Sequence, residues 1–83
     1  MRIYMQIPPM EGQTPRFYHL FLQPDLLEGW SLVKEWGQQG SPGQLRREHY
    51  PSREAAEAAL QQARDRQTRR GYTVVFARGE EQP

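Results

Sequence analysis

The chain has 83 residues, of which 36% are hydrophobic and 25% charged, and its formal net charge at pH 7 is +1. A chain of this length forms a single domain with a small core, which leaves little room for a deep active-site cavity. It contains no cysteine, which excludes disulfides and thiolate metal sites, and two histidines without a further ligand cluster predict neither a metal ion nor a cofactor.

The first strand is predicted over residues 2–7, where apolar and polar side chains alternate. Pro8 and Pro9 stop it, because proline cannot donate a ladder hydrogen bond. Since the strand is terminal and flanked by proline, we expect it at an edge of the sheet. Residues 10–15 are predicted to form a loop.

The second strand is predicted over residues 16–23, a stretch rich in β-forming residues. Alternation divides it into two largely apolar faces, with Phe17, His19 and Phe21 on one and Tyr18, Leu20 and Leu22 on the other. We therefore expect a central strand that is covered on both sides. Residues 24–29 then form a turn whose length suits antiparallel pairing with the next strand.

The third strand is predicted over residues 30–38, and it places Trp30 and Trp36 on one face together with Leu32 and Lys34. Glycines and a proline in residues 37–43 end it in a hairpin turn. This turn lacks the GxxxxGK[ST] sequence of a phosphate-binding loop. Trp36 therefore lies at a strand end, where an aromatic ring can either complete a core or present a flat surface to a ligand.

A fourth strand is predicted over residues 44–50, and a helix follows over residues 53–70. Ser52 is a suitable N-cap, and Gly71 suits the position after the helix. The apolar stripe of this helix is poor in large side chains; it consists of Ala56, Ala59, Leu60 and Ala63. Small side chains predict a close approach to the sheet, with aromatic rings supplied from the sheet side.

Residues 72–77 are β-branched and aromatic and predict a final strand or an extension over the helix end, followed by a polar tail at residues 79–83. The predicted fold is α+β, a small antiparallel sheet with one helix on one face. We expect residues 1–83 to form one domain with its core at about residues 16–77.

Taken together, these segments resemble the WGR domain. This module occurs in poly(ADP-ribose) polymerases and in small bacterial proteins, and it is named after a Trp-Gly-Arg tripeptide. The resemblance covers residues 17–72 and rests on the second strand, the Trp36-Gly37-Gln38 stretch and its turn, the Ala-rich helix and the Gly71-Tyr72 ending. It implies a sheet with one packed helix and a non-catalytic contact with DNA near a strand break, where Trp36 matches the tryptophan that packs on the backbone.

Two positions depart from the family pattern. Gln38 replaces the motif arginine, so a charge-assisted contact becomes a neutral amide contact. Gln67 stands where bacterial relatives commonly carry a lysine, and it is flanked by Arg66, Arg69 and Arg70. These flanking arginines could compensate for the missing lysine.

Two groups of basic residues are candidate phosphate contacts. Arg66, Arg69 and Arg70 share one face of the last helical turns, although an ordinary solvated surface with an Asp65–Arg69 pair is the alternative. Lys34, Arg46 and Arg47 lie on neighbouring strands beside the turn, although cross-strand pairing with Glu35 or Glu48 is the alternative. The candidate site is thus Trp36, Gly37, Gln38, Lys34, Arg46, Arg47, Arg66, Arg69 and Arg70.

The function predicted from these residues and the resemblance is non-catalytic binding of DNA or another nucleic acid. His19 and His49 lack the partners of a catalytic site, so we expect structural roles and no enzyme. The alternative is a module that binds a protein partner, or its own copy, through the Trp-Gly turn, residues 36–43. No apolar run approaches the about 18–20 residues of a membrane span, so we expect a cytoplasmic protein without membrane contact.

Overall fold

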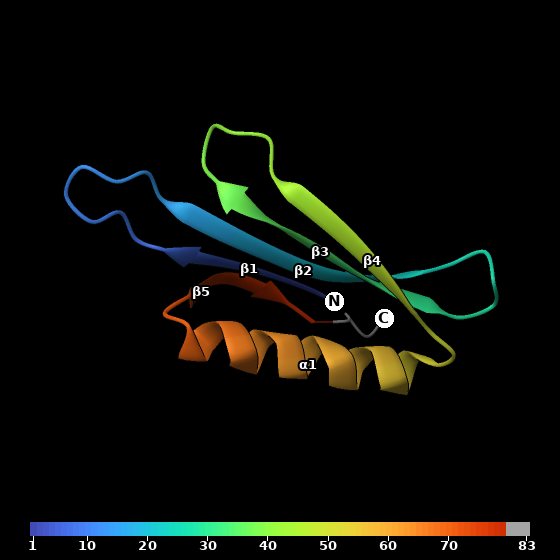
Figure 1. Ribbon diagram of the computed structural model, residues 1–83. Helices are drawn as coiled ribbons and strands as arrows, with labels where there is room; N and C mark the ends of the chain where they lie inside the picture. The colour runs from blue at the N-terminus through green and yellow to red at the C-terminus, as the bar shows by residue number, and fades with distance from the viewer. Residues whose placement is uncertain (80–83) are drawn as a thin grey trace.

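A computed structural model describes residues 1–79; residues 80–83, where most of the expected polar tail falls, lie outside the described residues. The elements in chain order are β1 (Arg2–Ile7), β2 (Arg16–Pro24), β3 (Trp30–Gln38), β4 (Gln44–Tyr50), α1 (Arg53–Arg69) and β5 (Thr73–Arg78). The strands form one antiparallel sheet, and α1 lies against one of its faces (Figure 1). The predicted α+β fold is therefore confirmed.

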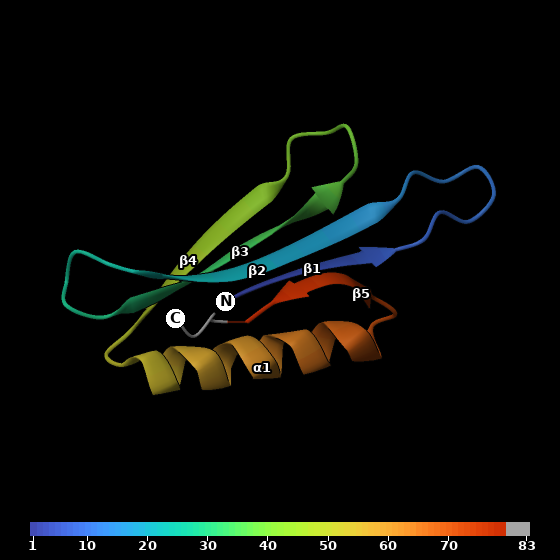
Figure 2. The same cartoon turned by 180° about the vertical axis from the view of Figure 1, so that it is seen from behind.

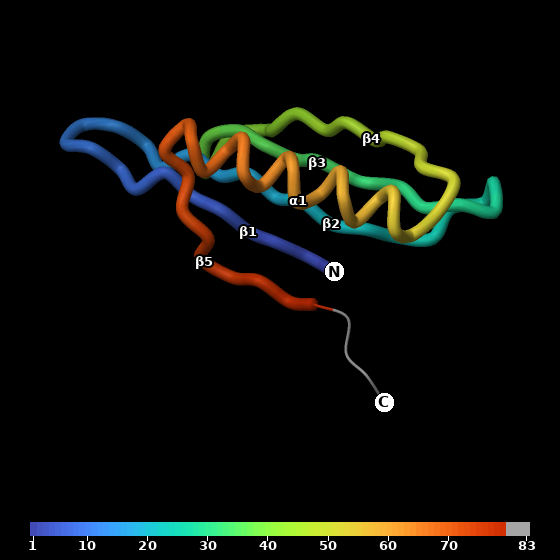
Figure 3. The backbone as a smooth tube through the Cα atoms, turned by 90° about the horizontal axis from the view of Figure 1, so that it is seen from below, coloured from blue at the N-terminus to red at the C-terminus, as the bar shows by residue number. Residues whose placement is uncertain are grey.

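The sheet has the strand order β4-β3-β2-β1-β5. The first four strands are joined by consecutive hairpins, each pairing with the next. The chain then runs along α1 below the sheet and returns as β5 beside β1 (Figure 2). Viewed from the helix side, α1 crosses β2 and β3, whereas β5 lies at the far edge (Figure 3).

The expectation that β1 is an edge strand is wrong, because β5 pairs with its outer side. Arg2 lies opposite Arg78, and Gln6 lies opposite Thr73, whose hydroxyl donates to the Gln6 carbonyl at 3.2 Å. Pro8 and Pro9 follow the last residue of β1, so they do not interrupt its ladder on either side. The edges of the sheet are β4 and β5.

The hydrophobic core lies between α1 and the facing side of the sheet. It is built from the buried residues Ile3, Met5, Tyr18, Leu20, Leu22, Leu32, Ala56, Leu60, Ala63 and Tyr72. The alanines of α1 allow the helix to approach the larger sheet side chains, as the apolar stripe predicts. Ser52 is the N-cap, and its hydroxyl accepts a hydrogen bond from the Ala55 N–H at 3.1 Å.

The expectation that β2 is covered on both sides is also wrong. Within residues 1–79, the single helix covers only the face that carries Tyr18, Leu20 and Leu22, all of which are buried. Phe17 and Phe21 lie on the opposite face and are half-buried. Neighbouring rings on that face shield each other laterally, which reduces the exposure of large apolar groups without a covering layer.

Candidate functional site

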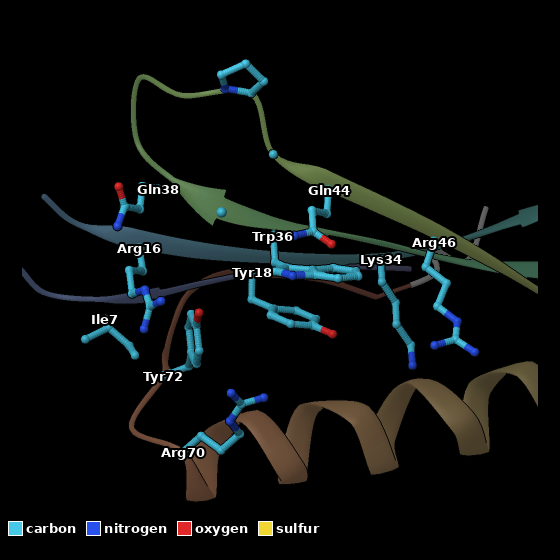
Figure 4. A pocket seen from close by; sticks show the side chains of 13 residues that line it. Ile7, Arg16, Tyr18, Lys34, Trp36, Gln38, Gln44, Arg46, Arg70 and Tyr72 are labelled. Atoms are coloured by element: carbon cyan, nitrogen blue, oxygen red, sulfur yellow. The ribbon is translucent and has the colours of Figure 1, made fainter.

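Trp36 lies near the end of β3 on the face of the sheet that carries the helix. It is opposite Tyr18 on β2 and Gln44 on β4. Its ring stacks on that of Tyr18 (Figure 4). The ring centroids are 5.6 Å apart and the angle between the planes is 11°. The ring of Tyr72 packs edge-on against the ring of Tyr18, with 5.6 Å between the centroids. The half-buried indole is therefore held by an aromatic layer that extends from the core.

The Trp-Gly turn closes tightly behind this ring. A Cβ atom at Gly43 would lie 2.6 Å from the Trp36 carbonyl oxygen and 3.2 Å from Cζ of Phe17. A Cβ atom at Gly37 would lie 3.0 Å from the Cα atom of Gly43. The two glycines let the strands meet where larger residues would push them apart.

A cavity of about 500 Å³ opens between this end of the sheet and the end of α1; we call it the Trp36 cavity. Its aromatic wall consists of Tyr18, Trp36 and Tyr72 (Figure 4). Its cationic side chains are Arg16, Lys34, Arg46 and Arg70, and no acidic side chain of the described residues lines it. Such a lining favours an anionic ligand that also has an apolar surface.

The structure brings six of the nine predicted site residues to the lining of this cavity: Lys34, Trp36, Gly37, Gln38, Arg46 and Arg70. Arg47 lies on the other face of the sheet, opposite Val33. Arg66 and Arg69 are exposed on the last turns of α1 and do not line the cavity. The charge of Arg66 nevertheless reaches Tyr18 and Tyr50.

Seven lining residues are not among the predicted site residues, and three of them are cationic or aromatic, namely Arg16, Tyr18 and Tyr72. Arg16 comes to the site because it pairs with Gln38 across the β2–β3 ladder, which only the register reveals. Alternation along β2 places Tyr18 on an apolar face, and its stack with Trp36 brings it to the cavity. Tyr72 belongs to the Gly71-Tyr72 ending, one of the segments on which the family resemblance rests, so the sequence does indicate this residue.

Two of the cations share one carboxylate that is not part of the cavity lining, that of Glu48. Lys34 Nζ lies 3.2 Å from Glu48 Oε2, and Arg46 Nε lies 3.5 Å from the same oxygen. Burial alone would raise the pKa of Glu48, but the hydrogen bond and charge of Lys34, the hydrogen bond from Tyr50 and the charge of Arg46 together lower it. The cross-strand pairing that was the alternative for Lys34 is thus present, and it fixes the ammonium beside the cavity.

Burial raises the pKa of Tyr18, although the charges of Arg66 and Arg70 oppose this effect. The phenol therefore stays protonated at neutral pH, so it adds no negative charge to the cationic cavity. It can act there as a neutral hydrogen-bond donor.

The two histidines take part in separate polar contacts. His19 Nδ1 lies 3.5 Å from Glu35 Oε1, and burial together with the charge of Arg2 lowers the pKa of His19. His49 is hydrogen-bonded to Asp25 in the β2–β3 loop. Among residues 1–79, no three His, Asp or Glu side chains are grouped to hold a metal ion. The helix in this part of the chain is not long and apolar enough to cross a membrane.

The family model described as the WGR domain matches residues 1–79, a range that contains every strand, the helix and the Trp36 cavity. No curated protein matches the chain significantly.

Proposed function

Because the chain belongs to the WGR domain family, which is associated with nucleic-acid binding, we propose that it is a non-catalytic module that binds nucleic acid at the Trp36 cavity. The ligand in this proposal is DNA, contacted at its backbone or at an end. The observation that carries the proposal is the meeting of an aromatic wall with four cationic side chains in one cavity.

Each kind of lining residue has a part in such a contact. The indole of Trp36 offers an apolar surface to a sugar or base, and base–aromatic stacking is worth about 1–3 kcal/mol. Arg16 and Arg70 lie on different elements beside it and can each bind a phosphate with two parallel hydrogen bonds. Gln38 is exposed at the rim and can donate from its amide. Lys34 supplies a positive charge whose position is held by its ion pair with Glu48.

The proposal predicts a marked dependence on salt. Contacts with about three phosphates would give a slope of about −2.7 for log K against log salt concentration on duplex DNA. A chain with a net charge of only +1 has a weak long-range field, so this slope would report the local cations of the cavity.

The test is a fluorescence anisotropy titration of a labelled duplex that carries a nick with a 5′-phosphate, at low and moderate salt. We expect binding that weakens with salt and is lost or much reduced in Trp36→Ala. Leu26→Ala is the matched control, because Leu26 is fully exposed in the loop at the other end of β3. Absence of binding by the folded wild-type protein at low salt would overturn the proposal.

A second candidate function is recognition of a protein partner or of a second copy through the Trp-Gly turn. The pairing of Lys34 and Arg46 with Glu48 favours this candidate, because Glu48 neutralises part of the positive charge at the cavity. Sedimentation velocity over a range of concentrations tests the second copy directly. Self-association that disappears in Trp36→Ala, without binding to DNA, would favour this candidate.

A further inference from the structure

The face of the sheet opposite the helix carries a continuous row of aromatic rings; we call it the helix-free face. Tyr4 and Phe17 are stacked with centroids 6.2 Å apart and planes within 11°. The ring centroid of His19 lies 5.8 Å from that of Tyr4 and 4.9 Å from that of Phe21. Figures 1 and 2 show that no element of residues 1–79 covers this side of the sheet.

The row continues onto the edge strand β5, and one further exposed apolar side chain, Leu45, lies on the other edge strand beyond Glu35. Phe76 on β5 pairs with Tyr4 and is 49% exposed. Leu45 on β4 lies across the sheet opposite Glu35 and is 58% exposed. Large apolar side chains that remain this accessible at the edges of a half-buried aromatic face are a feature that marks a binding surface.

The charged side chains of this face are mostly cationic. Arg2 places its guanidinium 5.3 Å from the centroid of the Phe21 ring, and Arg78 lies opposite Arg2 on β5. Arg47 adds a third cation on β4. Glu35 is the one carboxylate that the strands place on this face, and it faces His19.

The aromatic row leads into a hollow of about 380 Å³ beside Phe21. Three arginines line this hollow, namely Arg2, Arg53 and Arg78. The guanidinium of Arg53 lies 5.3 Å from the centroid of Trp30 and also pairs with Glu57 at 3.2 Å. Guanidinium groups held against rings keep their donors directed sideways, where a phosphate can reach them.

We propose that the helix-free face is a second nucleic-acid site, which binds an unpaired single strand. Bases stack on Tyr4, His19, Phe21 and Phe76, and phosphates contact Arg2, Arg78 and Arg47. This site is separate from the Trp36 cavity, which lies on the opposite face, and it does not depend on the function proposed for that cavity.

The geometry selects a single strand over a duplex. The ring centroids are 4.9 to 6.2 Å apart, wider than the about 3.4 Å rise between stacked nucleotides of one strand. Bases must therefore separate to occupy successive rings, and only an unpaired strand can turn the faces of its bases toward a sheet. A second copy of this chain fits less well, because three arginines on each copy would be brought together.

The test uses a labelled eight-nucleotide oligothymidine with a 5′-hydroxyl, which has neither a duplex nor a 5′-phosphate. In anisotropy titrations we expect Phe76→Ala to weaken binding about five- to a hundredfold. Its ring is half-exposed, so the variant should fold, and circular dichroism checks this. Leu26→Ala is the control for loss of an exposed apolar side chain elsewhere.

Nuclear magnetic resonance of the ¹⁵N-labelled wild-type protein locates the oligonucleotide without any substitution. We expect the largest shifts at the amides of Tyr4, His19, Phe21 and Phe76. Shifts centred on the indole N–H of Trp36, equal binding by wild type and Phe76→Ala, no binding at low salt, or dimer formation across this face would each overturn the proposal. A duplex that fails to bind at the Trp36 cavity would leave the oligothymidine result unaffected.

Discussion

The ring of Trp36 lies parallel to the ring of Tyr18, with centroids 5.6 Å apart. One residue is the half-exposed aromatic of the candidate site, and the other is a core residue that is 8% exposed. The stack therefore ties the orientation of the site tryptophan to the packing of the core.

This stack should be measurable as a coupling energy. We expect the double variant of Trp36→Leu and Tyr18→Leu to be less destabilised than the sum of the single variants, by about 0.5–1.5 kcal/mol. Urea denaturation of the four proteins gives this energy. Tyr18→Leu combined with Trp30→Leu is the control, because Trp30 lies at the opposite end of β3. Equal coupling in both cycles would contradict a specific contact.

Restoring the motif arginine should strengthen binding to DNA. Gln38 is exposed and lines the Trp36 cavity, so Gln38→Arg adds a charged fork there without removing a core contact. We expect about three- to tenfold tighter binding to the nicked duplex and a salt slope steeper by about 0.9. Gln62→Arg adds the same charge at an exposed position of α1 and should have a smaller effect. Equal gains from both variants would argue against a local contact.

Removing the shared carboxylate should separate binding from stability. Glu48→Gln leaves the ammonium of Lys34, whose side chain is 13% exposed, without its ionic partner. We expect a loss of about 1–3 kcal/mol in unfolding free energy, together with tighter binding to DNA because the cavity gains a net positive charge. Denaturation and anisotropy measure the two effects. Glu54→Gln, exposed in the first turn of α1, is the control. Weaker binding by a folded Glu48→Gln protein would contradict the electrostatic account.

A methyl group at Gly43 should disturb the turn behind Trp36. Its Cβ atom would meet the Trp36 carbonyl oxygen at 2.6 Å, so the hairpin has to shift. We expect Gly43→Ala to destabilise the protein by about 1–3 kcal/mol and to change tryptophan fluorescence. Ser41→Ala, an exposed residue of the same turn, should leave both unchanged. An unperturbed Gly43→Ala spectrum would show that the turn adapts without moving the ring.

The β2–β3 loop should make stability depend on acid pH. Burial alone would raise the pKa of Asp25, but hydrogen bonds from His49, from the N–H groups of Leu27 and Gly29, and from Ser31 lower it below 3.8. Because the folded pKa is lower than the unfolded one, this contribution is complete above about pH 4 and disappears as pH falls through the folded pKa.

We therefore expect Asp25→Asn to be less stable than the wild type at pH 7, with a difference that shrinks below pH 4. Urea denaturation at several pH values between 7 and 2.5 checks this. Asp65→Asn, an exposed residue of α1, should show no comparable change. A wild-type advantage that stays constant to pH 2.5 would contradict the assigned role.

Local patterns in the sequence predict most of the fold. Alternation places Trp30 and Trp36 on one face of β3, glycine marks the hairpin turn, and Ser52 and the alanines define α1. The position of β1 inside the sheet could not be predicted in this way. It depends on pairing with β5 at the far end of the chain, and a strand does not reveal its neighbours through its own periodicity.

The candidate site was predictable to the extent that it is local. Trp36, Gly37 and Gln38 are consecutive residues at the end of one strand, so the sequence alone places them together at the cavity. Arg46 and Arg47 could not both belong to it, because consecutive strand residues point to opposite faces. Arg16 joins the site through the register of β2 with β3, and Arg70 joins through the packing of α1. Both depend on contacts between segments far apart in the chain.

The placement of β5 beside β1 also bears on how the protein folds. The other strands pair through short hairpins, whereas Arg2 and Arg78 face each other only after nearly the whole chain has been ordered. Closing so long a loop costs more entropy than closing a hairpin, so we expect β5 to dock last and to exchange its amide hydrogens fastest among the strands. Until that step, β1 is an exposed template for strand addition, and the nascent chain is most prone to aggregate there.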